Sequence, residues 1–303
     1  PNVRKNTVLG GLAAGIAAAG IIILLYLMND SIRNAGDIER YLDLNTLGQI
    51  PEFEENQRRK KKKSKWGRRA VEQMQKVEFK KIPQLDFRTN EAFKTLRTNI
   101  TFCGDDQRVI LFTSTIPNEG KTSVVFQLAR SFAEDGKRVL LLDADMRKSV
   151  LMGHYRVDRE TRGLSHYLVG QESAENVTYS TNIENMEVIF AGPSTPNPAE
   201  LLGNSRFEEM LSEQRGNYDY ILIDPPPLGS VIDAAIIARN VDGAVIVVES
   251  GVISYKMVQK VKGQLEKSGC RILGAVLNKV DQENKGYYSG YYSKYYGKYY
   301  GYG

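Results

Sequence analysis

The hydrophobic pattern of the chain opens with a long uncharged segment. Residues 7–28, TVLGGLAAGIAAAGIIILLYLM, contain no charged side chain. As a helix, this segment would rise about 33 Å, which is enough to cross a bilayer core of about 30 Å. We therefore expect a transmembrane helix at about 7–28, rather than a buried helix of a soluble protein. Gly11, Gly15 and Ala19 would share one face of it, at a spacing that lets membrane helices pack closely.

A second pattern begins near residue 86 and predicts an α/β domain. In NEAFKTLRTNITF, apolar residues recur at helical spacing at Phe93, Leu96 and Ile100. Short apolar runs then alternate with helical segments: RVILFTS, KRVLLLDAD, MEVIFAG, YDYILIDPP, GAVIVVES and RILGAVLNK. Continuous apolar strands between helices are typical of a mostly parallel sheet that helices cover on both faces. We expect one such domain over residues 86–285.

Residues 29–85 read as a charged linker with short ordered pieces, among them LGQIPEF. Within the linker, residues 58–69, RRKKKKSKWGRR, are a basic collar without an acidic side chain. Positive charge stays on the cytoplasmic side of a membrane, so everything after residue 28 is expected to be cytoplasmic. A nucleic-acid patch is the competing interpretation. Beside a predicted membrane span, contact with anionic headgroups is preferred, and no nucleic-acid partner is expected.

The last residues, 286–303, read GYYSGYYSKYYGKYYGYG. Glycine-rich sequence without aliphatic side chains cannot form a core, so a disordered tail is predicted. Either its phenol groups have a purpose of their own, or the tail is a low-complexity segment without one. The tail tyrosines are Tyr287, Tyr288, Tyr291, Tyr292, Tyr295, Tyr296, Tyr299, Tyr300 and Tyr302.

Composition narrows the kind of chemistry. The 303 residues are 42% hydrophobic and 25% charged, so the chain can build a sizeable core. Two cysteines, Cys103 and Cys270, provide no disulfide framework and no metal-ligand spacing. Two histidines are too few for a histidine-based metal site or catalytic triad.

The first predicted strand of the domain runs into a phosphate-binding loop. Thr115 to Thr122 reads T-x-x-x-x-G-K-T, which departs from the usual pattern only at its opening residue, normally glycine. Gly120 permits the tight turn, Lys121 would reach the phosphates, and the Thr122 hydroxyl would bind Mg²⁺. The expected nucleotide-binding residues here are Thr115, Ile116, Pro117, Asn118, Glu119, Gly120, Lys121, Thr122 and Ser123.

Carboxylates follow two other predicted strands. Asp224 ends an apolar strand, as expected of a Walker B residue, and Asp143 and Asp145 end another, with Arg147 close behind. Parallel sheets bind ligands at the carboxyl ends of their strands, so these groups should converge on one nucleotide. Thr122, Asp143 and Asp224 are the expected ligands of Mg²⁺.

One further pattern concerns the choice of nucleotide. LNKVD, which includes Asn278 and Asp281, matches the N-K-x-D by which many GTPases read guanine. A D-x-x-G after the Walker B strand is absent, because three prolines follow Asp224. We therefore favour ATP, with Asn278 as a further nucleotide-binding residue, and keep GTP open.

Together these motifs resemble the bacterial tyrosine kinases of the polysaccharide-export type, the BY-kinase family. The family's three nucleotide motifs correspond to residues 115–122, 140–147 and 221–224. PSTPNPAELLGNSRF, from residue 193, resembles its P-x-x-P-x-P-x-E-L-L segment, and the Tyr-rich end resembles its autophosphorylated cluster. Residues 1–28 resemble the end of the attached Wzz-type domain with its second transmembrane helix. An extracytoplasmic part would then precede this sequence.

EAFKTLR resembles the family's E-x-x-R-x-x-R element, which joins kinase domains into a ring, an octamer by resemblance. Glu91 and Arg97 match, and Lys94 replaces the first arginine. Lysine cannot make the bidentate contact that arginine makes, so a weaker interface is expected. Because the stretch LGQIPEF joins the membrane segment and the kinase in one chain, the resemblance implies intramolecular activation.

The resemblance implies an ATP- and Mg²⁺-dependent protein-tyrosine kinase that phosphorylates its own tail between subunits and so regulates polysaccharide polymerisation and export. Lys121 would bind phosphates, and Asp143 or Asp145 would orient or deprotonate the phenol. Implied partners are a tyrosine phosphatase, polysaccharide polymerase and export proteins, and sugar-nucleotide enzymes as substrates.

Two other functions stay open from sequence. One is a membrane-associated ATPase switch of the MinD/ParA type, which usually carries a further lysine early in its phosphate loop. None precedes Lys121 here. The other is a silent polysaccharide co-polymerase scaffold, against which the intact phosphate loop and strand-end carboxylates argue.

Overall fold

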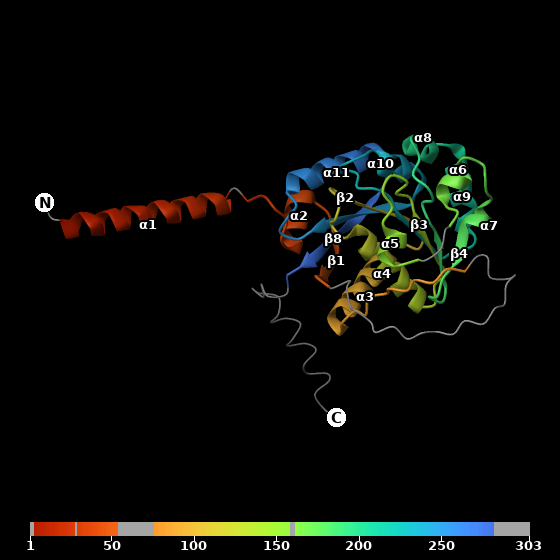
Figure 1. Cartoon of the computed structure of the whole chain (residues 1–303), viewed down its shortest axis with the longest axis horizontal. Helices are drawn as coiled ribbons and strands as arrows, with labels where there is room; N and C mark the ends of the chain where they lie inside the picture. The colour runs from red at the N-terminus through yellow and green to blue at the C-terminus, as the bar shows by residue number, and fades with distance from the viewer. Residues whose placement is uncertain (1–2, 28, 54–75, 158–160, 282–303) are drawn as a thin grey trace, which may run out of the picture.

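The computed structural model describes residues 3–27, 29–53, 76–157 and 161–281. They form an α/β structure whose sheet has the order β1-β8-β7-β2-β6-β3-β5-β4 (Figure 1). All neighbouring strands in it are parallel except β4, which pairs antiparallel with β5. The predicted mostly parallel sheet is therefore confirmed. The strands are β1 (Thr46–Pro51), β2 (Val109–Ser114), β3 (Val139–Asp143), β4 (Thr178–Ser180), β5 (Met186–Ile189), β6 (Tyr220–Asp224), β7 (Gly243–Glu249) and β8 (Ile272–Val280).

Helices cover both faces of the sheet, because the buried strands alternate their apolar side chains between two layers of core. On one face, α3 and α4 pack against side chains such as Ile110 and Phe112. On the other, α2, α9 and α11 pack against side chains such as Val109 and Leu111. The helices are α1 (Val3–Leu27), α2 (Ala35–Leu42), α3 (Phe87–Thr101), α4 (Lys121–Glu134), α5 (Leu151–His154), α6 (Leu164–Leu168), α7 (Ala174–Val177), α8 (Pro198–Leu202), α9 (Ser205–Arg215), α10 (Asp233–Ile237), α11 (Tyr255–Lys267) and the 3₁₀ helix η1 (Ala238–Asn240).

Two parts of the expected linker are built into this structure. Strand β1 pairs with β8 at the edge of the sheet. Residues 76–82 lie along the opposite edge, where Val77 N donates to Ser180 O at 2.9 Å. Phe79 is 2% exposed, and its ring contacts that of Phe126 edge to face at a centroid distance of 5.0 Å. Both pieces contribute core side chains to the domain.

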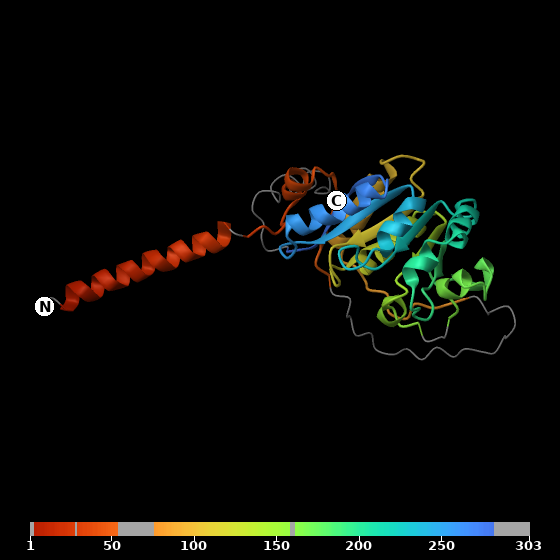
Figure 2. The ribbon, with the colours of Figure 1, turned by 90° about the horizontal axis from the view of Figure 1, so that it is seen from above.

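Helix α1 projects away from the rest of the structure in both views (Figures 1 and 2). No helix within the described residues is both long enough and apolar enough to span a membrane. The predicted span over 7–28 is thus not confirmed. The basic collar at 58–69 and the Tyr-rich tail at 286–303 lie outside the described residues.

Candidate functional site

The phosphate-binding loop lies between the carboxyl end of β2 and the start of α4. Gly120 immediately precedes α4 with φ of +81°, the left-handed region that favours glycine. A Cβ atom at this position would lie only 2.2 Å from Asn278 Nδ2. The left-handed turn therefore favours glycine here, and the Asn278 side chain leaves little room for a Cβ atom.

Glu119 braces the loop from within. Its Oε1 accepts the backbone N–H groups of Thr115 at 2.6 Å and Ile116 at 2.7 Å, and its Oε2 accepts that of Glu249 at 3.1 Å. The side chain is 1% exposed, and burial raises the pKa of Glu119 to about 7. The opening residue of the loop is thus fixed through its backbone, which is consistent with threonine in place of the usual glycine.

Lys121, Thr122 and Asp224 meet where the loop faces the end of β6. The Lys121 ammonium group contacts Asp224 Oδ1, and the Thr122 hydroxyl donates to Asp224 Oδ2 at 2.7 Å. Lys121 is 7% and Asp224 2% exposed. The expected convergence of the phosphate loop with the Walker B strand is therefore present.

Asp143 stands beside Asp224, since the two residues are register partners at the ends of β3 and β6. Its side chain accepts the N–H of Asp145 at 3.1 Å and the hydroxyl of Ser149. Burial, and then the charge of Asp224, raise the pKa of Asp143 to about 7. The expected pair of carboxylates thus sits in a site that disfavours two negative charges.

Asp145 is only partly buried and lies in the turn that follows β3. Its Oδ1 accepts the N–H groups of Arg147 at 3.2 Å and Lys148 at 2.9 Å. The Arg147 guanidinium extends from this turn to Asp233, the first residue of α10. Sequence reasoning missed Asp233, because no local motif marks it.

The N-K-x-D segment holds the loop from the side of β8. Asn278 Nδ2 donates to Glu119 O at 2.8 Å, and Lys279 Nζ donates to Asn118 O at 2.7 Å. Lys279 also pairs with Glu249 at 3.0 Å. The Oδ1 atom of Asn278 is buried and has no partner within the described residues. Lys279 belongs to the N-K-x-D motif, whereas Glu249 is a residue beside the loop that sequence reasoning missed.

The remaining predicted residues fall into two groups. Ile116, Pro117, Asn118 and Ser123 belong to the same loop or to the first turn of α4. Glu91, Lys94 and Arg97 lie on α3, away from the loop. Lys94 pairs with Glu91 at 2.7 Å, both half-exposed, whereas Arg97 is held by its own chain at Ser131 O (2.7 Å) and Asp135 (3.0 Å).

The donor set beside the loop suits a hard cation. No group of three or more His, Cys, Asp or Glu side chains able to hold a metal occurs in the described parts of the chain. Mg²⁺ in nucleotide sites commonly takes one or two carboxylates and completes its shell with phosphate and water oxygens. Asp143, Asp224 and the Thr122 hydroxyl fit that pattern.

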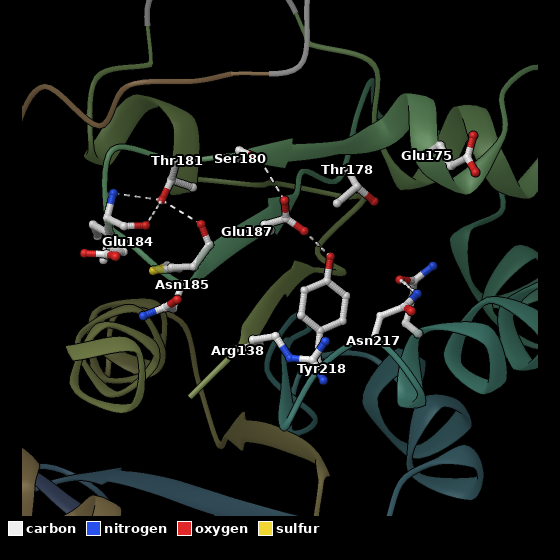
Figure 3. A pocket seen from close by; sticks show the side chains of 13 residues that line it. Arg138, Glu175, Thr178, Ser180, Thr181, Glu184, Asn185, Glu187, Asn217 and Tyr218 are labelled. Atoms are coloured by element: carbon white, nitrogen blue, oxygen red, sulfur yellow. Dashed lines mark hydrogen bonds between the residues drawn. The ribbon is translucent and has the colours of Figure 1, made fainter. Parts of the chain in front are cut away.

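A separate cavity of about 590 Å³ lies at the amino ends of β3, β5 and β6, the opposite end of the sheet (Figure 3). The Tyr218 hydroxyl donates to Glu187, which also accepts the Ser180 hydroxyl at 2.7 Å. None of the predicted site residues lines this cavity. The phosphate loop, not this cavity, is the candidate active site.

Comparison with known proteins shows the family to which the chain is related. A family model described as an AAA domain matches residues 107–268. The tyrosine-protein kinase CpsD of Streptococcus agalactiae is 40% identical over 200 residues, which cover 66% of this chain and 87% of that protein. The structure of the kinase domain of the Escherichia coli tyrosine kinase ETK aligns with a TM-score of 0.72 and 28% identity, over 84% of this chain and 98% of that one. The septum site-determining protein MinD of Pyrococcus horikoshii, complexed with Mg-ADP, aligns with a TM-score of 0.50 and 29% identity, over 56% and 70%.

The raised pKa of Asp143 predicts how a substitution changes stability with pH. Between about pH 4 and pH 7 the folded protein keeps a proton on Asp143 that the unfolded chain has released. The contribution of this residue to stability therefore falls as the pH rises through that window. The side chain in Asp143→Asn cannot ionise. The free energy of unfolding of this variant should therefore exceed that of the parent by roughly 1–3 kcal/mol at pH 8 and by little at pH 4.5.

Urea unfolding in the presence of a chelator measures this difference. Glu119 titrates over the same range in both proteins and cancels in the comparison. An equal gap in the free energy of unfolding at both pH values would contradict the prediction.

Proposed function

The chain belongs to the bacterial protein-tyrosine kinase family, and we propose that the site beside the phosphate loop transfers the γ-phosphate of ATP to tyrosine. The observation that carries this proposal is the meeting of Lys121, Thr122, Asp143 and Asp224 from three separate elements at one end of the sheet. These are the groups that phosphoryl transfer needs: a cation and loop amides for the phosphates, and oxygen ligands for a metal ion.

Each residue has a role in the proposed reaction. Lys121 exchanges its contact with Asp224 for phosphate oxygens, and the loop amides bind the same phosphates. Thr122, Asp143 and Asp224 would hold Mg²⁺, which would neutralise charge on the phosphates. The phenol oxygen bonds to the γ-phosphorus as the bond between that phosphorus and the β–γ bridging oxygen breaks, and ADP leaves with this oxygen. The phenol proton passes to a carboxylate.

Asp145 is the better placed of the two candidate carboxylates for that proton. Both oxygens of Asp143 are engaged, by Asp145 N–H and by Ser149, and its side chain is 1% exposed. Asp145 is more open to the solvent, and the two amides that it accepts both bind Oδ1, which leaves Oδ2 for a substrate hydroxyl. A phenol of pKa near 10 is protonated at neutral pH, so a positioned base assists its attack.

The free acceptor on Asn278 supports ATP over GTP. Because Asn278 Nδ2 is already used by Glu119 O, the group that remains for a base is Oδ1. Adenine offers an amino donor at the position where guanine carries a carbonyl acceptor. Lys279, which a GTPase would use beside the guanine, is bonded to the loop and to Glu249.

The proposed substrate is the tail, Tyr287–Tyr302, of a neighbouring subunit in a ring. Glu91 and Lys94 are exposed on α3 and available for such an interface, with Arg97 beside them. Each phosphate adds a charge of about −1.5 to −2, so a phosphorylated tail would be repelled by the carboxylates of the site. Phosphorylation would then dissociate the ring, and a phosphatase would restore it. In this way the kinase would regulate polysaccharide polymerase and export proteins, with sugar-nucleotide enzymes as further substrates.

We also propose that the chain is anchored in the cell membrane through residues 7–28. Large apolar side chains on α1, such as Leu12 and Ile16, are more than half exposed. Apolar surface of this extent is unfavourable in water, and lipid would cover it. The basic collar would add contact with anionic headgroups on the cytoplasmic side.

Intact-mass spectrometry tests the kinase proposal directly. After incubation with Mg²⁺ and ATP, the chain should gain a ladder of phosphates that map to Tyr287–Tyr302, and Lys121→Met should gain none. GTP should support the reaction at least about tenfold more slowly, because its base leaves the Asn278 acceptor unpaired. Nucleotide turnover without a mass change would instead indicate an ATPase switch.

Membrane extraction tests the anchor. The full chain in native membranes should resist alkaline carbonate, whereas residues 29–303 alone should be released by high salt, since only the collar would hold them. Release of the full chain by carbonate would contradict an integral anchor.

Mass photometry tests the role of the tail in the ring. On addition of ATP and Mg²⁺, the full chain should shift toward smaller assemblies, and a chain ending at residue 285 should not. The same ATP-dependent change in both would contradict the model.

A further inference from the structure

A bidentate ion pair joins two loops of the candidate active site. Arg147 Nε donates to Asp233 Oδ2 at 2.7 Å, and Arg147 Nη2 donates to Asp233 Oδ1 at 2.9 Å. The Asp233 side chain is fully buried, whereas that of Arg147 is 39% exposed. Removal of the arginine would leave the Asp233 carboxylate buried without a cation, which destabilises the folded protein. The two parallel hydrogen bonds also fix the orientation of the two side chains.

On the side of Arg147, the pair holds the turn that carries Asp145. The N–H of Arg147 donates to Asp145 Oδ1, and the N–H of Asp145 donates to Asp143 Oδ1. The backbone of the turn therefore donates to the carboxylates of Asp143 and Asp145. The Arg147 guanidinium joins the same turn to Asp233. Asp145 lies between these two points of attachment.

On the side of Asp233, the pair reaches the base of the phosphate loop. The segment 225–232, which joins β6 to α10, is tied to β2 because Leu228 N donates to Thr113 Oγ1 at 3.1 Å. A Cβ atom on Gly229 would lie 2.0 Å from Thr115 O, so this segment also packs directly against the first residue of the phosphate loop. Asp233 thus follows a segment that is held against the start of the phosphate loop.

We propose that Arg147 and Asp233 form a clamp that positions Asp145 relative to the γ-phosphate. The inference rests on the proposed function of this site and names positioning residues for its reaction. Neither residue is assigned contact with ATP or tyrosine. Loss of the clamp would let the turn move, and a displacement of about 1 Å can lower the rate of a positioned reaction about 100-fold.

A double-mutant cycle tests the clamp. The full chain is prepared with Arg147→Gln, with Asp233→Asn and with both changes. The substrate is isotope-labelled full chain carrying Lys121→Met, so that transfer in trans is read by mass. Each single change should lower kcat roughly 10- to 100-fold with less than about threefold change in KM for ATP. The double change should be no worse than either single change, because both remove the same interaction.

A matched ion pair elsewhere in the fold supplies the control. Arg215 is also bidentate to an aspartate, Asp242, at 2.8 Å for both contacts, and its side chain is 37% exposed. That pair lies at the amino end of β2, where Asp242 also accepts the N–H of Val109. Arg215→Gln should therefore leave kcat within about twofold of the parent. Arg147→Lys keeps the charge but cannot form two parallel hydrogen bonds, so its loss of kcat should be smaller than that of Arg147→Gln. This variant tests the clamp even if Asp233→Asn folds poorly.

Additive losses of kcat in the double variant would overturn the clamp. A large loss of kcat for Arg147→Gln with normal kcat for Asp233→Asn would also overturn it, because Arg147 would then act without Asp233, for example by contacting a substrate. Unchanged kcat in all variants would also overturn it. Tyrosine phosphorylation by enzyme that itself carries Lys121→Met would instead reject the proposed site. The two failures are therefore distinguishable.

Discussion

The structure depends on how buried charge is balanced at the carboxyl end of the sheet. Asp143 and Asp224 end neighbouring parallel strands in register, and both are almost completely buried. Within the described residues, Lys121 is the buried cation available to them. Burial, and then the neighbouring charge of Asp224, raise the pKa of Asp143. A divalent cation bound between the two carboxylates would offset their charge, which is consistent with the metal site proposed above.

The loop around this charge is held from several directions, and most of the contacts come from distant parts of the sequence. Glu119 fixes the start of the loop through backbone amides, and β8 fixes its middle through Asn278 and Lys279. Strand β1, from the segment between the apolar helix and the kinase domain, pairs with β8. Strand β8 therefore contacts both β1 and the phosphate loop.

Much of the candidate site could be predicted because its motifs are local. A strand, a glycine turn and a helix with Lys121 and Thr122 specify a phosphate loop wherever they occur. An aspartate at the end of an apolar run specifies a carboxylate at the ligand-binding edge of a parallel sheet. The apolar runs themselves predicted the sheet, since strands buried on both faces lack the alternation of half-exposed ones. These inferences needed only neighbouring residues and the geometry of parallel strands.

The rest was decided by strand order and packing, which no local pattern encodes. Asp233 meets Arg147 across 86 positions of sequence, and Glu119 turns its carboxylate inward because β7 presents an amide to it. Arg97, expected at an interface between subunits, is bonded to the helix beside it. LGQIPEF, predicted as an ordered piece of the linker, contributes to the edge strand β1, and its pairing with β8 was not predicted. Sequence by itself predicted which groups lie at the carboxyl end of the sheet, because each belongs to a local motif. Tertiary structure decided which partners hold them, because those contacts form only once distant segments share one core.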